Sequence, residues 1–451
     1  MISPFKGQLL VTILYIVPVF FMALGANSYG ADEFERPPIE YSASTPDNCV
    51  TKLQDRLDRA ELQLAFDDEC GYLPALLEAL CVPVESQMLV FSKTSLQRQR
   101  ISPSTPRAIY FNDDVYVGFC QRGKALEVSV ADPQLGAVFY TFDQQRVDKP
   151  RFVRQTDNCM ICHSSSRTDS VPGHLVRSLF ADASGEPILA AGSNMVDHTT
   201  PLGQRWGGWY VTGKHGSQQH LGNLIVRGKD VPQPVDNSLG QNVTELNALL
   251  PVEEYLTPHS DIVALMVFEH QTLVHNRIAK ANFATRQAIH YEAELNRALG
   301  EPEGTRLEST TRRIQSAGDD LIEALLMVGE ATLTAGISGT SGYSEMFTRI
   351  GPHDPAGRSL RELDLERRVF KYPCSYLIYS DAFDQLPAAM RDYVWTRLWN
   401  VLSKHQAAQK FAHLSAEDRR AIVEILRATK LDLPEYWLGT ANASTTQAST
   451  P

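Results

Sequence analysis

The sequence predicts an α+β fold, with an N-terminal helix and a small antiparallel sheet followed by a mostly helical C-terminal half. Two observations lead to this prediction. Short β-branched and aromatic runs, punctuated by Gly, Pro, Asn and Asp, fill residues 86–144, as is typical of small antiparallel sheets. From Pro258 onward, apolar residues recur at helical spacing instead. We expect one integrated body, because the connecting stretches are short and unlike linkers.

The composition is that of a globular protein with a sizeable core. The 451 residues are 43% hydrophobic and 21% charged, which are ordinary values. The net charge is −11, and no run of Lys and Arg stands out. Because phosphate binding requires a clustered basic surface, we expect no nucleic acid as a partner.

The N-terminal residues 1–31 differ from the rest of the chain. Lys6 is the only charge before Asp32, and the apolar run from Leu9 to Leu24 is followed by small residues. This pattern predicts a secretory signal peptide, and therefore an exported, periplasmic protein without stable membrane insertion once the signal is removed. An uncleaved anchor is the alternative, but the run is short for a membrane span, which needs about 20 apolar residues.

The N-terminal region, residues 45–150, is predicted to begin with helix and continue with the sheet. The segment KLQDRLDRAELQLAF at 52–66 places leucines at helical spacing, so we expect helix between Asp47 and about Leu80. Asp113 and Asp114 lie in FNDDV, between two strand-like runs. Since turns favour Asn and Asp, we interpret this pair as a turn rather than as catalytic carboxylates.

A cysteine motif stands at the centre of the chain. Residues 157–163 read DNCMICH, in which Cys159 and Cys162 are three apart and His163 follows directly. Cys-x-x-Cys-His is the attachment signature of c-type haem. One helical turn brings residues i and i+3 to one face, so both thiols can add to vinyl groups of one porphyrin while the histidine binds the iron. The motif therefore predicts one haem c, held by two thioethers and a proximal imidazole.

Two other interpretations of the motif are disfavoured by its surroundings. A redox dithiol normally follows a strand and opens a long helix, whereas QTDNCMICHSSSR is polar on both sides of the cysteines. A structural zinc site requires a second Cys or His pair at suitable spacing, and none accompanies this one. An export signal also favours haem, because haem attachment takes place outside the cytosol.

The remaining cysteines suit an exported protein, in which disulfides are plausible. Four of them lie in the N-terminal part, where up to two bridges have three alternative pairings. We expect the fifth, Cys374, to stay free. The five cysteines outside the motif are Cys49, Cys70, Cys81, Cys120 and Cys374.

The motif resembles the attachment site of c-type cytochromes. Beyond it, VPGHLVRSLF, RWGGWYVTGKHG and CSYLIYSDAFDQLP resemble a family of large exported bacterial proteins with a single such motif, over roughly Gly71 to Trp437. The resemblance implies thioether anchors at Cys159 and Cys162 and a proximal ligand at His163. The chain departs from small soluble cytochromes c, since strand-like sequence precedes the motif and no Met-Pro dipeptide is present.

The rest of the chain is predicted as a haem-attachment region at 151–235, a helical region at 255–440 and a disordered tail at 441–451. In the haem-attachment region, 174–193 is interpreted as a hairpin and 205–216 as a strand flanked by glycines. Helical periodicity is present in four segments, near residues 259–298, 306–336, 386–404 and 415–430.

The sixth iron ligand is sought first on the helix predicted over 261–283. On a helical wheel, His270 falls in the middle of the apolar face, Met266 lies one turn earlier, and His275 falls on the polar side. A buried histidine needs a partner, and iron, a carbonyl or a carboxylate would each satisfy it. His270 and Met266 are therefore distal candidates.

Other residues are weaker candidates for the haem surroundings. Trp206 and Trp209 either pack in the core or form a haem wall, and Arg205 either lies at the surface or pairs with a haem propionate. His174 is expected to lie too close in sequence to His163 to cross the ring. Loop candidates for the distal ligand are Met195, His198, His215 and His220.

These observations predict an exported monohaem c-type cytochrome that acts in electron transfer with a redox partner protein. The alternative is a haem enzyme, peroxidase-like or another oxidoreductase, whose iron is open on the distal side, because the distal ligand decides between these functions. The large size of the chain favours the enzyme, since carrying one electron needs far less protein. A third interpretation is non-catalytic, either a haem-based sensor or one subunit of a larger respiratory complex, and it is less favoured because no separate signalling module is present.

Overall fold

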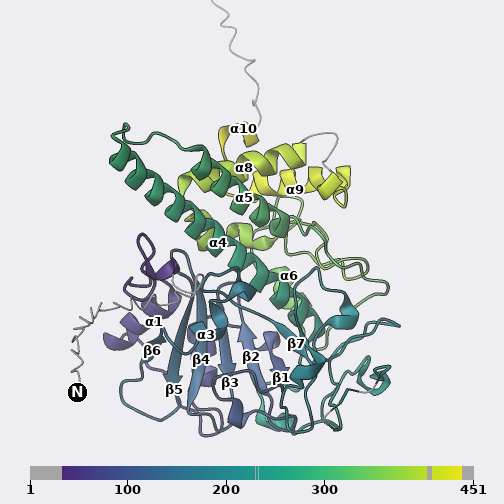
Figure 1. Cartoon of the computed structure of the whole chain (residues 1–451). Helices are drawn as coiled ribbons and strands as arrows, with labels where there is room; N and C mark the ends of the chain where they lie inside the picture. Colours follow the sequence, from purple (N-terminus) through teal and green to yellow (C-terminus); the bar gives the residue numbers. More distant parts are fainter. Residues whose placement is uncertain (1–32, 229, 232, 404–408, 439–451) are drawn as a thin grey trace, which may run out of the picture.

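The fold is α+β, as the sequence predicts: a six-stranded antiparallel sheet is followed by a helical C-terminal half (Figure 1). The computed structural model describes residues 33–228, 230–231, 233–403 and 409–438. The predicted signal peptide at 1–31 and the predicted tail at 441–451 lie outside the described residues.

The sheet is a meander in which each strand pairs antiparallel with the next one in sequence. Its strands are β1 (Met88–Val90), β2 (Arg107–Phe111), β3 (Val115–Phe119), β4 (Ala125–Asp132), β5 (Gly136–Asp143) and β6 (Phe152–Gln155). The turn predicted at Asp113 and Asp114 is confirmed, because Oδ1 of Asn112 accepts hydrogen bonds from the backbone N–H groups of Asp114 and Val115, at 3.0 and 2.8 Å.

The two faces of the sheet have different neighbours, because successive side chains of a strand point to opposite sides. On β4, Leu126, Val128 and Val130 are buried in a hydrophobic cluster with residues of α1 (Cys49–Asp58) and α2 (Leu73–Ala79). The residues between them, among which are Glu127 and Ser129, occupy the other face. In the register, Glu127 lies opposite Gly118 of β3 and Thr141 of β5.

The helix expected between Asp47 and Leu80 is two short helices instead. The first, α1, ends at Asp58, and Ala60 two residues later has a φ of 57°. This left-handed conformation is incompatible with a continuing α-helix. Leu62 and Leu64, which continue the leucine spacing, therefore belong to irregular chain that packs against the hydrophobic cluster, and helix resumes only at Leu73 as α2.

The central segment contains little regular structure. A short helix, α3 (Met160–His163), carries the cysteine motif, and β7 (Arg177–Leu179) pairs with β8 (Ser193–Met195), which confirms the predicted hairpin. The strand predicted at 205–216 is wrong. Only isolated bridges occur there, and Trp206 and Gly208 have φ values of 67° and 85°, which interrupt an extended strand.

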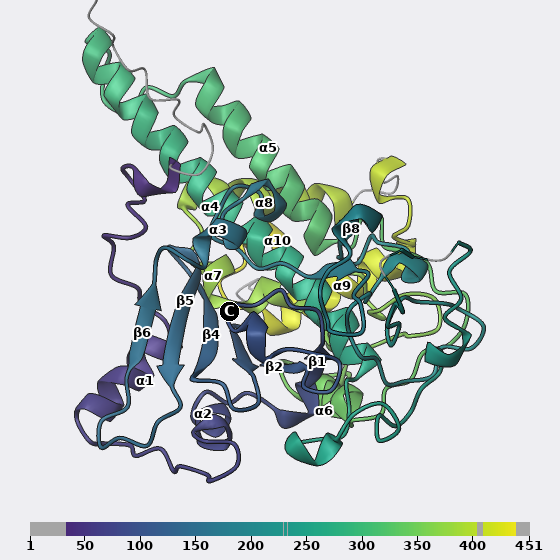
Figure 2. The same ribbon diagram turned by 60° about the horizontal axis from the view of Figure 1, so that its bottom comes forward.

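The C-terminal half is built around α4 (Ile262–Leu299). Asp261 caps its start by accepting hydrogen bonds from the backbone of Val263 and Ala264, and Gly300 ends it in the left-handed conformation. Figures 1 and 2 show α4 and α5 side by side, extending from the sheet to one end of the molecule. The other helices are α5 (Glu308–Leu325), α6 (Tyr343–Arg349), α7 (Asp381–Asp384), α8 (Ala388–Ser403), α9 (Ala416–Thr429) and α10 (Glu435–Leu438).

Three of the four predicted helical segments match α4, α8 and α9 closely, whereas the segment predicted over 306–336 ends at Leu325 as α5. Within the described residues, no helix combines the length and apolarity needed to cross a bilayer. Short 3-10 helices occur at Glu33–Glu35, Val84–Ser86, Arg98–Arg100, Ser166–Thr168, Leu189–Ala191, Leu202–Gln204, Ser238–Gly240, Val252–Glu254, Tyr376–Tyr379 and Gln409–Phe411.

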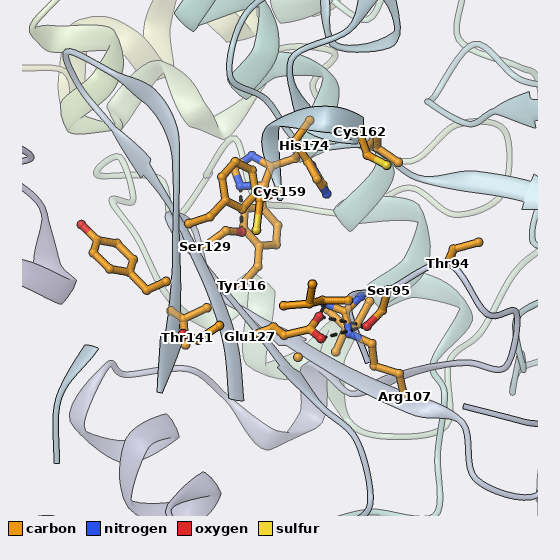
Figure 3. Close-up of a pocket in the computed structure, with 18 of the residues that line it drawn as sticks. Thr94, Ser95, Arg107, Tyr116, Glu127, Ser129, Thr141, Cys159, Cys162 and His174 are labelled. Atoms are coloured by element: carbon orange, nitrogen blue, oxygen red, sulfur yellow. Dashed lines mark hydrogen bonds and ion pairs between the residues drawn. The ribbon is translucent and has the colours of Figure 1, made fainter. Parts of the chain in front are cut away.

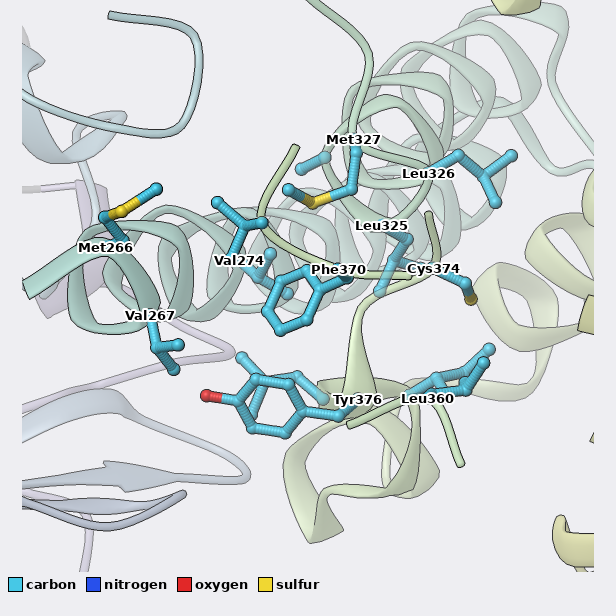
Figure 4. Packing of buried hydrophobic residues seen from close by; sticks show 14 of the residues in the cluster. Met266, Val267, Val274, Leu325, Leu326, Met327, Leu360, Phe370, Cys374 and Tyr376 are labelled. Atoms are coloured by element: carbon cyan, nitrogen blue, oxygen red, sulfur yellow. The ribbon is translucent and has the colours of Figure 1, made fainter. Parts of the chain in front are cut away.

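The first half of α4 is buried on all sides. It packs in the larger hydrophobic cluster with α5, α8 and the segment around Phe370 (Figure 4). His275, expected on an exposed polar side, is only 5% exposed, and its Nδ1 lies 2.9 Å from the hydroxyl of Tyr116 on β3. The helical-wheel expectation for His275 was wrong, because it assumed an exposed face that this helix lacks.

Candidate functional site

The three residues of the cysteine motif line one cavity. It has a volume of about 440 Å³ and lies between α3 and the face of β2–β5 that carries Glu127 and Ser129 (Figure 3). Its volume falls in the range of small-molecule and cofactor sites. Apolar side chains from three elements contribute to its walls: Ile109 of β2, Phe139 of β5 and Phe268 of α4.

The imidazole of His163 is held in a defined orientation. Its Nδ1 lies 2.9 Å from the carbonyl oxygen of Gly173. A carbonyl only accepts, so Nδ1 carries the proton and the lone pair remains on Nε2, which has no hydrogen-bond partner among the described residues. Burial lowers the pKa of His163, which favours the neutral ring. This is the form in which histidine binds metals, with the second nitrogen held by an outer partner.

The loop after α3 positions Gly173. The backbone N–H of Gly173 donates to the carbonyl of His163 at 2.8 Å. One residue later, the side chain of Asn276 on α4 accepts from the N–H of His174 at 2.8 Å and donates to its carbonyl at 2.7 Å. The long helix thus fixes the loop, and the loop fixes the proximal imidazole.

Both thiols of the motif are unpaired, as are the other five cysteines of the chain. Burial, reinforced by the charge of Glu127, raises the pKa of Cys159 to about 11. Reactive dithiols have a lowered thiol pKa instead. Within the described residues, no three His, Cys, Asp or Glu side chains are arranged to hold a metal ion, so Cys159, Cys162 and His163 do not form part of a closed zinc cage.

His174 lies in the same cavity as His163, although its sequence position had argued against a place at the site. The loop folds back, so that the ring of His174 packs 4.3 Å from that of Tyr116 and its Nε2 lies 3.0 Å from Oγ of Ser129. Its Nδ1 is buried without a hydrogen-bond partner. Burial lowers the pKa of His174 well below its usual value, so the ring is neutral.

The structure does not bring the predicted distal residues to the cavity. Nδ1 of His270 lies 3.1 Å from Nδ1 of His198, and its Nε2 lies 2.8 Å from Oγ of Ser375. Met266 is buried in the hydrophobic core, as Figure 4 shows. The helix α4 instead presents Phe268 to the cavity. Protein partners, rather than iron, satisfy the buried imidazole of His270.

The predicted haem surround of Arg205, Trp206 and Trp209 also lies elsewhere, since none of the three lines the cavity. Arg205 forms a buried ion pair with Glu269, whose other oxygen accepts from the indole N–H of Trp206 at 3.2 Å. Trp209 donates to the carbonyl of Arg177 at 2.8 Å. The loop candidates Met195, His198, His215 and His220 likewise lie outside the lining of the cavity.

Sequence reasoning missed the wall opposite α3. Arg107, Tyr116, Glu127 and Ser129 all line the cavity from the sheet. The signal that identifies this wall is the alternation in ALEVSVAD on β4, where polar residues stand between buried apolar ones. The alternation of polar and apolar residues on β4 shows that one face of the sheet is polar. It does not show that α3 lies over this face and forms a cavity with it.

Comparison of the chain with protein-family models, with curated proteins and with solved structures finds no match.

Proposed function

We propose that the chain is an exported c-type cytochrome with one haem c in the cavity beneath α3. Cys159 and Cys162 form the two thioethers, and Nε2 of His163 is the proximal ligand. The observation that carries this proposal is the arrangement around His163: two free thiols and an imidazole, held through Nδ1 by Gly173, all line one cavity. If the motif were an unstructured surface segment, nothing would orient the imidazole of His163 in this way.

The residues present fit the chemistry of attachment. Each S–H adds across one vinyl double bond, with sulfur bonding to one carbon and hydrogen to the other, so no oxidant is consumed. The neutral imidazole offers its lone pair without first losing a proton. Ile109, Phe139 and Phe268 supply apolar walls against which a porphyrin could pack. The bound haem would supply one-electron chemistry, which its axial ligands and surroundings tune.

Electron transfer to a redox partner protein is the function that this arrangement supports best. α3 lies at the surface: Cys162 is exposed, and Ile161 beside it is 77% exposed. A motif at the surface would bring the edge of the attached haem within reach of a partner protein. The net charge of −11 favours a partner with a basic patch.

A haem enzyme with an open distal iron is the second candidate, and one observation favours it. Among the described residues that line the cavity there is no methionine and no lysine, whereas the wall opposite α3 carries the ion pair of Arg107 and Glu127. A polar wall of this kind suits the binding of a small molecule at the iron.

Intact-mass analysis of the protein produced in an export-competent host tests the proposal. The mature chain should exceed the mass of its amino acids by one haem, and the double variant C159A/C162A should not. The matched control C49A/C81A, at two exposed cysteines outside the cavity, should keep the added mass. A native chain without added mass would refute the proposal. Optical spectra with and without carbon monoxide then separate a closed from an open iron.

A further inference from the structure

The wall of the cavity opposite α3 contains an ion pair that is largely shielded from solvent. Nη2 of Arg107 lies 2.9 Å from Oε2 of Glu127, and the two side chains are 20% and 15% exposed. Figure 3 shows this pair with Ser95 on one side of the cavity and Cys159 and Cys162 on the other. The pair therefore lies across the cavity from the two thiols that would hold the haem.

Arg107 has one donor to spare at the cavity. Its guanidinium lies against the backbone of Gly118, where an added Cβ would stand 2.4 Å from Nη2 and 2.6 Å from Nε. Nε is buried there, out of reach of a ligand, and Nη2 pairs with Glu127. Nη1 is not buried and makes no hydrogen bond within the described residues, so it is the donor that a ligand in the cavity would meet.

Glu127 is held by three neighbours. Its carboxylate forms the ion pair with Arg107, accepts from the side-chain amide of Gln97 at 3.2 Å, and shares the single O–H of Ser95 between its two oxygens, at 2.9 and 3.1 Å. A carboxylate offers about four lone-pair sites, and because one of these hydrogens is shared, a further proton can be accommodated. The side chain is fixed by these bonds and remains part of the cavity wall.

The other groups at the cavity that bind iron in proteins are engaged elsewhere, with the exception of one nitrogen of His174. The hydroxyl of Tyr116 contacts Nδ1 of His275 at 2.9 Å and accepts from Gln271 at 2.9 Å. Nε2 of His174 contacts Ser129, whereas its Nδ1 has no hydrogen-bond partner. With no methionine or lysine among the described lining residues, an exogenous ligand competes with His174 for the sixth iron position.

The charge of the pair bears on the class of ligand. Arg107 and Glu127 together are neutral, so the pair itself offers an anion no net attraction. A neutral weak acid HX can use both groups. Its proton would pass to the carboxylate of Glu127, and the anion X⁻ would keep the guanidinium of Arg107 as its hydrogen-bond donor, so that total charge is conserved.

We propose that this wall is a binding site for a small neutral weak acid, of the class of hydrogen peroxide or hydrocyanic acid, with Glu127 as proton acceptor and Arg107 as hydrogen-bond donor to the resulting anion. The proposal rests on the proposed haem c and deepens it, because it assigns the sixth iron position to a ligand from solution.

Stopped-flow mixing of the oxidised holoprotein with cyanide at neutral pH, followed by the shift of the haem absorption band, tests the proposal. E127Q should slow association by about tenfold or more, because a positioned proton acceptor is lost, and should change dissociation little. R107Q should speed dissociation by about tenfold, because a charge-assisted hydrogen bond to the anion is lost. R107K, which keeps a cation beside Glu127, should show a smaller effect and serves if R107Q does not fold.

Two controls separate the proposed roles from general damage. Carbon monoxide carries no proton, so E127Q should leave its association with the reduced protein unchanged within about twofold. E292Q makes the same change at another buried glutamate, which pairs with Arg306 at 3.2 Å outside the cavity, and should leave cyanide kinetics unchanged.

The proposal is overturned if haem-loaded native protein shows no band shift with cyanide, or if E127Q and R107Q bind cyanide as the native protein does. It is also overturned if cyanide binds only after His174→Ala, which would assign the sixth position to His174. Each of these outcomes leaves the attached haem in place. A chain without the added mass of haem instead refutes the proposed function itself.

Discussion

The Nδ1 atom of His163 lies 2.9 Å from the carbonyl oxygen of Gly173, ten residues further along the chain. This hydrogen bond ties the last residue of α3 to a loop that Asn276 holds against α4. The orientation of the proposed iron ligand therefore depends on Gly173 and Asn276, which lie outside the lining of the cavity. Partners of this kind tune metal affinity and ligand basicity.

Gly173→Ala should disturb this arrangement. An added Cβ would stand 2.5 Å from Oδ1 of Asn276 and 3.0 Å from Cβ of Thr168, so the loop must shift and the carbonyl that holds His163 moves with it. We expect a changed reduction potential of the proposed haem and a loss of about 1–2 kcal/mol in unfolding free energy. Redox titration and urea unfolding measure these effects. An unchanged potential would show that the carbonyl does not tune the ligand.

His270→Ala should leave the optical spectrum unchanged, in contrast to His163→Ala. Both ring nitrogens of His270 contact protein groups, His198 and Ser375. Removing the ring creates a cavity and leaves Oγ of Ser375 without this partner, so we expect a loss of about 2–4 kcal/mol in stability. Urea unfolding and absorption spectra of the oxidised and reduced protein check both statements. A spectral change would return His270 to the list of iron ligands.

A double-mutant cycle on Arg205 and Glu269 should reveal strong coupling in stability, without any effect on the spectrum of the proposed haem. Burial raises the pKa of Glu269 to about 8, while the charge of Arg205 opposes this shift. Removal of either partner leaves a buried group unpaired, at about 3–5 kcal/mol. We expect R205M/E269L to be more stable than R205M or E269L alone, as urea unfolding would show. Additive losses would contradict the pairing.

The elements of the sheet were predictable because alternation and turn residues are local signals. The runs around Tyr110, Val117, Val128 and Tyr140 all became strands, and Asn112 formed the turn between two of them. The same local reasoning failed at 205–216, where aromatic and glycine residues suggested a strand. Those aromatic side chains make long-range contacts, such as that of Trp206 with Glu269, which no local pattern contains.

The candidate site was predictable only as far as its motif. Cys159, Cys162 and His163 are adjacent in sequence, and their spacing alone indicates their chemistry. Arg107 and Glu127 lie on strands twenty residues apart and meet only because β2, β3 and β4 pair in register. The residues across the cavity from α3 are set by the tertiary fold. The apolar face of a single helix therefore does not predict which side chain reaches the iron.

Acid should destabilise the protein below about pH 6.5 because several histidines are buried in neutral form. Burial lowers the pKa of His220 to about 3, against about 6.5 for an unfolded chain. Between these values the unfolded state binds the extra proton, so stability is present above pH 6.5 and is lost as pH falls. For this group alone the loss at pH 5 is about 2 kcal/mol.

His220→Asn tests this dependence, because the amide oxygen of Asn can replace Nδ1 as acceptor of the N–H of Gly222, now at 3.0 Å. Urea unfolding at pH 7.5 and at pH 5 should show a smaller acid-induced loss in the variant than in the native chain, by about 2 kcal/mol. Equal losses in both proteins would mean that His220 is not held neutral.

Gly118→Ala should displace the guanidinium of Arg107 while the fold is kept. Gly118 lies within β3, where Ala adopts the extended backbone without strain, so the effect of the methyl group is confined to its neighbour. That neighbour is the guanidinium of Arg107, 2.4 Å from the added Cβ at Nη2. An arginine side chain can move aside, but this one belongs to a largely shielded ion pair, so we expect a loss in unfolding free energy of about 1–3 kcal/mol.

The displacement of Arg107 should also break its contact with Glu127 and move its hydrogen-bond donors away from the wall opposite α3. We expect faster dissociation of cyanide from the oxidised haem protein, in the direction of R107Q, measured by stopped-flow absorption. Gly203→Ala is the matched control, because its added Cβ would meet only the carbonyl oxygen of Gln219, at 3.8 Å. If Gly118→Ala and Gly203→Ala release cyanide at the same rate, the position of the guanidinium does not govern the ligand, and Arg107 acts only as the counter-ion of Glu127.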